Sequence, residues 1–240
     1  GPGAVTTTTS PAFTITHAAA SQIAVTTQPS ASTVAGVAFA TQPVVTIRDA
    51  FGNTVTTGGD ATVTITASLT TGTGTLGGTL TKAAVAGVAS FSANGLNINL
   101  AGTDKVLTMA TTLSGPGAVT TTTSPAFTIT HAALDHFAVT NTSGGNIPDQ
   151  NIAVTFFINV TAQDAFNNTV TNFNGTGNTV NISASGATLD LGSGTTADFA
   201  SGVLSSHGVR FNSTGTGVTI TATRTSGGAQ NGTSNSFNVT

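Results

Sequence analysis

Hydrophobic and polar residues alternate along most of the chain, and this alternation predicts short β-strands. In residues 61–67, Val63 and Ile65 alternate with Thr62, Thr64 and Thr66, and residues 179–183 show a similar pattern. Strict alternation is typical of a strand with one face in a core and the other in water. Threonine suits the outer positions, because its branched Cβ favours extended backbone and its hydroxyl tolerates water. Similar strands are predicted for residues 13–16, 43–48, 107–111, 153–161 and 218–223.

The predicted strands are separated by residue pairs that favour tight turns. Gly-Asn, Gly-Gly, Asn-Gly and Ser-Gly pairs recur between them, and such pairs supply the backbone conformations that turns require. The strands follow one another at intervals of roughly 8–12 residues, which is typical of an all-β sandwich. A sustained helical period is absent from the sequence. We therefore expect an all-β protein, with seven to nine short strands in each sandwich.

The chain contains an internal repeat. Residues 1–19 read GPGAVTTTTSPAFTITHAA, and residues 115–133 read the same. The two copies begin at residues 1 and 115, and the distance between these starting points is a plausible length for one domain. We interpret residues 20–133 as one β-sandwich repeat and 134–240 as a diverged second repeat. Residues 1–19 are then the closing strand of a preceding repeat whose body is missing.

Composition excludes several classes of function. The chain has 5 Lys and Arg, 8 acidic residues and no Cys, Trp or Tyr. Without Cys there is no disulfide or thiolate chemistry. A net charge of −3 with scattered cations does not form the basic surface that nucleic acids require, so no nucleic-acid partner is expected. Apolar runs stay well below the ~18 residues of a membrane-spanning helix, so we expect no membrane insertion.

Two segments of the first repeat resemble a known family. The run QPSASTVAGVAFATQPVVTIRDAFGNTV (residues 28–55) and the segment 72–91 look like the bacterial immunoglobulin-like repeats of large extracellular adhesins and invasin-type surface proteins. The resemblance covers residues 20–133 well and 134–240 more loosely. It implies two tandem immunoglobulin-like β-sandwiches in a structural module of an extracellular filament or cell-surface stalk, with copies of itself as partners. Two alternatives stay open: an adhesin module that binds a cell-surface ligand through its loop tips, and an accessory domain of a secreted hydrolase.

A second recurring motif provides the most conspicuous local signal. Asp49-Ala-Phe-Gly-Asn-Thr-Val-Thr56 recurs as Asp164-Ala-Phe-Asn-Asn-Thr-Val-Thr171. Calcium requires six to eight oxygen ligands, usually from several carboxylates, and each copy of the motif offers one Asp. We therefore interpret it as a structural turn, in which the Asp accepts backbone N–H bonds and Gly52 or Asn167 takes a positive φ. Phe51 and Phe166 are expected to plug the edges of their own sandwiches. No metal and no cofactor are predicted.

Catalysis is not expected. The four histidines are isolated along the chain, and the sequence lacks a Gly-x-Ser-x-Gly nucleophile elbow. We therefore assign no catalytic residue and expect the histidines near the repeat boundaries to pack between domains. These histidines are His17, His131 and His136.

The segment at residues 1–19 has the pattern of a strand without a sandwich of its own. Val5, Phe13 and Ile15 are the apolar residues of this segment that alternate with or flank threonines. Strand addition to another chain would supply main-chain hydrogen bonds and bury these side chains. We hypothesise that residues 5–16 complete or augment a sandwich of a neighbouring subunit in a head-to-tail filament.

Overall fold

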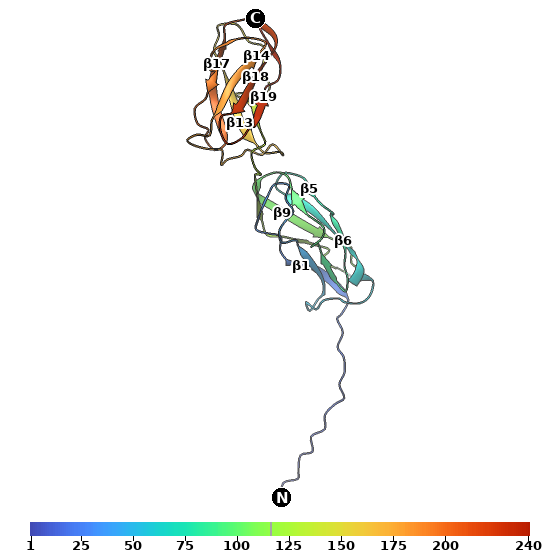
Figure 1. The fold of residues 1–240 in the computed structure, drawn as a ribbon. Coiled ribbons are helices and arrows are strands. Elements are labelled where there is room, and N and C mark those ends of the chain that lie inside the picture. Colours follow the sequence, from blue (N-terminus) through green and yellow to red (C-terminus); the bar gives the residue numbers. More distant parts are fainter. Residues whose placement is uncertain (116) are drawn as a thin grey trace.

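The computed structural model describes residues 1–115 and 117–240, and its fold is all-β (Figure 1). Pro116, which belongs to the recurring segment 115–133, lies outside the described residues. Helical structure in the described residues is confined to one 3-10 turn, η1 (Gly59–Thr62). Across these same residues, no helix is both long and apolar enough to cross a membrane.

Two facing sheets build the first repeat. The first sheet has the order β1-β3-β7 and the second the order β2-β11-β9-β4-β6, with β10 also paired to β9. Strands β5 and β8 form a further, separate two-stranded pair. The strands are β1 (Ala20–Thr27), β2 (Ser32–Val34), β3 (Val44–Asp49), β4 (Thr64–Thr71), β5 (Leu76–Gly77), β6 (Thr81–Ala83), β7 (Val88–Ser90), β8 (Asn97–Ile98), β9 (Gly102–Ala110), β10 (Thr121–Thr123) and β11 (Phe127–Thr130).

The second repeat is built in the same way. One sheet has the order β12-β13-β17-β15 and the other the order β16-β14-β18-β19, with β20 also paired to β18. The strands are β12 (His136–Asn141), β13 (Phe156–Gln163), β14 (Val180–Ser185), β15 (Leu189–Leu191), β16 (Gly194–Thr195), β17 (Val203–Phe211), β18 (Gly215–Arg224), β19 (Asn231–Thr233) and β20 (Phe237–Val239).

The two repeats share one strand order, although their strand counts differ. The described residues form eleven strands in the first repeat and nine in the second. Part of the difference arises because β17 is continuous where the first repeat has two strands, β7 and β8. The rest arises because a single bridge, Gln150 to Val239, takes the place of the parallel pair β2-β11.

Each repeat has its own hydrophobic core between its two sheets. In the first, Ile47, Ile65 and Leu107 are fully buried, and the cluster lies within residues 20–129. In the second, the cluster lies within residues 137–239. The alternation of the sequence accounts for these cores, because inward residues such as Ile65 are buried while their threonine neighbours face water.

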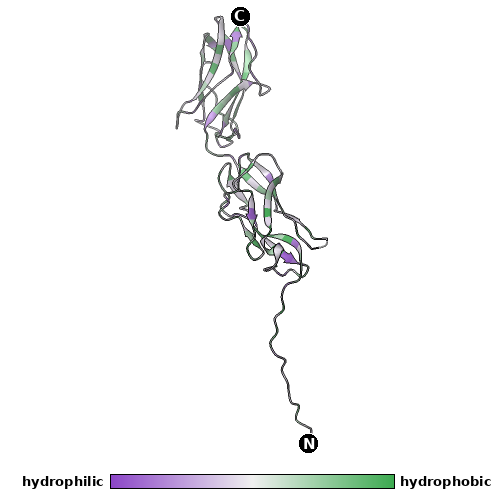
Figure 2. Cartoon of the chain, turned by 90° about the vertical axis from the view of Figure 1, so that its right-hand side faces the viewer, coloured by the Kyte–Doolittle hydropathy of each residue, from purple (hydrophilic) through white to green (hydrophobic). Residues whose placement is uncertain are grey.

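The two sandwiches lie end to end (Figures 1 and 2). The last strand of the first repeat, β11, ends at Thr130, and β12 begins at His136. The chain enters each sandwich at one end and leaves it at the other, so the linker 131–135 runs between facing ends. This arrangement makes the turns at those ends the parts of each repeat that can meet a neighbour.

Three predicted strands differ from the structure. Strand β4 begins at Thr64, because η1 takes up residues 59–62 and Gly58, with φ 84°, turns the chain before it. Strand β13 begins at Phe156, because Ala153 has φ 61° and bends the preceding residues away from the sheet. Residues 13–16 lie outside the sheets, in an extended segment that spans residues 1–18.

Candidate repeat-docking site

The facing ends of the two repeats are joined by the loop 164–168. The carboxylate of Asp164 is fully buried. Its Oδ1 accepts the backbone N–H groups of Phe166 and Asn168, each at 2.9 Å. Its Oδ2 accepts the backbone N–H of Ala132, in the linker, at 2.8 Å, and the side-chain amide of Asn168 at 2.9 Å. One carboxylate therefore fixes both the shape of the loop and the path of the chain that arrives from the first repeat.

These hydrogen bonds decide the charge state of Asp164. Burial acts to raise the pKa of this carboxyl, because it disfavours the charged form. The hydrogen bonds from Ala132, Asn168 and Phe166 outweigh burial and hold the pKa of Asp164 below its ordinary value. The carboxylate is thus ionised at neutral pH, and charge-assisted hydrogen bonds are the stronger kind.

The side chain of Asn168 connects the loop to the first repeat. It is 7% exposed. Its Oδ1 accepts the backbone N–H of Ala101 at 2.8 Å, and its Nδ2 donates to the carbonyl oxygen of Asn99 at 2.9 Å. The same Nδ2 donates its other hydrogen to Asp164. The amide of Asn168 therefore has both hydrogens donated and its oxygen occupied, as a buried amide requires.

Phe166 makes the apolar part of this contact. Its ring lies against Gly36 of the first repeat, so closely that a Cβ on Gly36 would overlap the end of the ring. The expectation that Phe166 plugs the edge of its own sandwich is therefore wrong. The motif comes directly after β13, at the end of the sandwich next to the first repeat, and its ring reaches the neighbouring repeat instead. We name Asp164, Phe166 and Asn168 the clamp of the second repeat.

The first repeat carries the same clamp in Asp49, Phe51 and Asn53. Asp49 is fully buried and accepts the backbone N–H groups of Phe51 and Asn53, each at 2.9 Å. It also accepts the backbone N–H of Ala18 at 2.9 Å and the side-chain amide of Asn53 at 3.0 Å. Gly52 has φ 86° where Asn167 has φ 65°. The side-chain amide of Asn53 is the largest influence on the pKa of Asp49, which falls from 3.8 to about 2.

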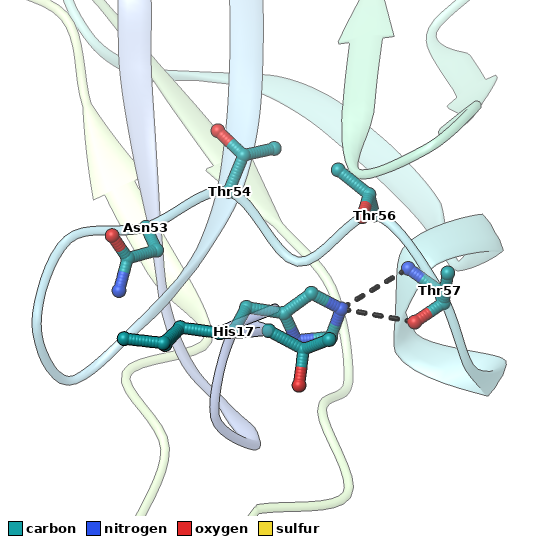
Figure 3. Close-up of a pocket in the computed structure, with 7 residues that line it drawn as sticks. His17, Asn53, Thr54, Thr56 and Thr57 are labelled. Atoms are coloured by element: carbon teal, nitrogen blue, oxygen red, sulfur yellow. Dashed lines mark hydrogen bonds between the residues drawn. The ribbon is translucent and has the colours of Figure 1, made fainter. Parts of the chain in front are cut away.

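The linker residues repeat their contacts as well. His17 and His131 each place Nδ1 2.8 Å from the carbonyl oxygen of the next alanine. His17 also accepts the backbone N–H of Thr57 through Nε2, at 3.3 Å, with the Thr57 hydroxyl at 3.0 Å (Figure 3). His17 borders a hollow of about 320 Å³ that Asn53, Thr54 and Thr57 also line. His136, by contrast, lies 3.0 Å from Asp135 at the surface.

The two clamps differ in what they contact. Phe166 is 37% exposed and Asn168 is 7% exposed, because the first repeat covers them. Phe51 is 83% exposed and Asn53 is exposed as well. The expectation that Phe51 plugs its own sandwich is therefore also wrong. Val5, Phe13 and Ile15, the predicted assembly residues, are 78–90% exposed in the extended segment.

A scan against family models and a search of curated proteins both give no match for this chain. Among the described residues, no group of three or more His, Cys, Asp or Glu could hold a metal ion. The chemistry of the clamp is hydrogen bonding and apolar contact, and what it does is to orient one sandwich on another.

Replacing Asn168 by Ala should loosen the junction. The variant removes two hydrogen bonds between the repeats, which together contribute about 1–3 kcal/mol, so the undocked fraction should rise roughly tenfold. Because the chain lacks Cys, spin labels at Ser68→Cys and Ser183→Cys, which are equivalent exposed positions of the two repeats, report the distance across the junction. The label distance distribution should broaden.

Asn53→Ala is the matched control. It removes the equivalent bond to Asp49 but has no neighbouring repeat to release. The Ser68–Ser183 distribution should keep its width. Equal broadening in the two variants would contradict the role assigned to Asn168.

Stability should fall in acid. The pKa of Asp49 is about 2 in the folded protein, against an ordinary value of 3.8. A lowered folded pKa contributes stability that is complete above the ordinary value and is lost as the pH falls towards the folded one. Asp164 acts in the same direction. The unfolding free energy of the protein should therefore decrease over this window, and Asp49→Asn should flatten the dependence. An NMR titration that places the Asp49 carboxyl at its ordinary pKa would refute this prediction.

Proposed function

We propose that this chain is a structural module of an extracellular filament or cell-surface stalk, built from tandem immunoglobulin-like sandwiches and without catalytic activity. The observation that carries the proposal is the clamp. Asp164 and Asn168 bind the linker and the preceding repeat at once, and Asp49 already binds its own linker in the same way. The clamp, which orients one sandwich on the next, is present in both repeats. Such a repeated clamp is expected of a chain that serves as an extended spacer.

The surface chemistry supports the same proposal. Charged residues make up 5% of the chain, and uncharged side chains such as Thr64, Thr66 and Ser183 occupy many outward positions of the strands. Only 5 Lys and Arg leave few sites for trypsin-like proteases, which suits a protein outside the cell. The absence of Trp and Tyr removes the side chains on which sugar binding usually rests.

Strand addition is our proposal for the extended segment. Phe13 and Ile15 occupy the positions that Phe127 and Ile129 hold in the recurring sequence, and there both side chains are buried. The same two residues in the extended segment thus have the pattern of a closing strand. Both described sandwiches already have a strand at this place, β11 and β20. The segment would therefore close a sandwich that lacks its own closing strand, or augment the sheet edge of a copy of the protein, which is its proposed partner.

The location can be tested on cells of the source organism. Antibodies raised against residues 20–240, detected with gold particles in negative-stain microscopy of intact cells, should label surface stalks or filaments. The reason is that a spacer of this kind acts only when it projects from the surface. Gold confined to lysed cells, or native material that consists of monodisperse particles, would contradict the proposal.

The role of residues 1–19 can be tested by their deletion. Polymers of the full chain should shorten or disappear in the truncated chain, because the strand that enters the neighbouring subunit is lost. Polymer length is measured by sedimentation or microscopy. A second variant, Phe13→Thr with Ile15→Thr in the full-length chain, keeps the backbone and removes the apolar side chains that the strand would bury. Its polymers should also be shorter. Filaments of unchanged length in both variants would defeat the strand-addition proposal.

A further inference from the structure

The clamp of the first repeat is complete, and among the described residues no sandwich lies against it. We propose that Phe51 and Asn53 form a docking surface for the end of another sandwich that has glycine at the position of Gly36. A side chain at that position, such as Ala153 in the second repeat, would displace the phenylalanine ring from this contact. This inference rests on the proposed function as a tandem array and adds to it a rule for which repeat can precede which.

The docking surface has its polar groups oriented in advance. The Asn53 amide donates one hydrogen to Asp49, as Asn168 does to Asp164. In the described residues, Oδ1 and the second Nδ2 hydrogen of Asn53 have no protein partner. In Asn168 these same two groups bind Ala101 and Asn99. Asn53 therefore presents an acceptor and a donor spaced for the backbone of an equivalent loop.

Phe51 sets the requirement for glycine. Its counterpart Phe166 lies where a Cβ on Gly36 would be, so any side chain there forces the ring out of its place. Gly36 also has φ 74°, a conformation that glycine adopts most readily. Repeat 1 therefore accepts a clamp at this end because position 36 has no side chain.

The second repeat has Ala153 at the equivalent position. The backbone N–H of Gly36 donates to Ile98, and that of Ala153 donates to Phe211, at 2.9 Å in both cases. Ala153 keeps a positive φ of 61°, so the two backbones follow the same path. The methyl group of Ala153 occupies the space that a clamp phenylalanine requires.

The linker sequence identifies the occupant. Residues 1–19 repeat residues 115–133, so a sandwich docked ahead of Ala18 would close with the sequence that closes repeat 1. Ala18 already donates to Asp49 as Ala132 does to Asp164. Both the closing sequence and the linker contact indicate a sandwich of the repeat 1 kind, with glycine at position 36.

The test is an extended chain in which a second copy of residues 20–114 precedes Gly1 of the full protein. Spin labels at Ser68→Cys of the added copy and Ser68→Cys of the original first repeat report the new junction. The expected distance distribution matches, in mean and width, the one between Ser68 and Ser183 in the 240-residue chain. A distribution that is much broader than this reference would overturn the proposal.

Two variants of the extended chain test the rule itself. Phe51→Ala, and separately Gly36→Ala in the added copy, should each broaden the new distribution at least twofold. Phe51→Ala in the 240-residue chain is the control and should leave the Ser68–Ser183 distribution unchanged. Insensitivity to Phe51→Ala would overturn the docking surface, and insensitivity to Gly36→Ala alone would overturn the glycine requirement. These outcomes are independent of gold labelling, which reports only where the protein resides.

Discussion

A buried carboxylate whose partners are all N–H groups determines the geometry of each repeat end. Burying a charge is costly unless it is hydrogen-bonded, and Asp164 meets this requirement with three backbone groups and one side-chain amide. These donors come from the linker and from the loop. The hydrogen bond from Ala132 forms only when the linker takes a defined path. The positions of Phe166 and Asn168 on the neighbouring repeat follow from that path.

Hydroxyl pairs stabilise the outer faces of the sandwiches, and ion pairs such as that of Arg210 with Asp190 are few among the described residues. Thr70 and Thr108 lie 2.8 Å apart across β4 and β9, and Thr221 and Thr233 lie 3.0 Å apart across β18 and β19. Cross-strand pairs of this kind stabilise a sheet without charge. The surface is consequently hydrated but nearly neutral. The stability that these pairs give to the sheets therefore depends less on salt concentration than the stability from ion pairs would.

The sequence predicts the all-β fold well, because alternation places residues such as Ile65 and Ile182 in the core, where they are buried. The motif at Asp49 and Asp164 predicts a turn, since Asp, Gly and Asn have local preferences that act within a few residues. The contact of Phe166 with Gly36 could not be predicted in this way. An aromatic residue beside a strand indicates a core position, and its true partner, Gly36, is defined only when two domains meet.

The contacts of Asn168 were missed for a related reason. Its partners are backbone groups of Asn99 and Ala101, and backbone groups leave no signature in the side-chain sequence. The sequence contains one signal of this contact. Asn stands at both 53 and 168 of the recurring motif, although the turn itself does not require Asn there. The bend at Ala153 is not predictable from the sequence, because alanine is compatible with a strand and only the backbone φ of 61° departs from one.

The route of the chain through each sandwich has a mechanical consequence. The chain enters repeat 1 through β1 in one sheet and leaves through β11 in the other, at the opposite end (Figure 1). Tension applied along the rod therefore reaches the core through two strands that are paired sideways to their neighbours, β1 with β3 and β11 with β2 and β9. Such a load shears several hydrogen bonds together instead of unzipping them singly. Resistance to extension is then set by the unfolding barrier of a whole sandwich.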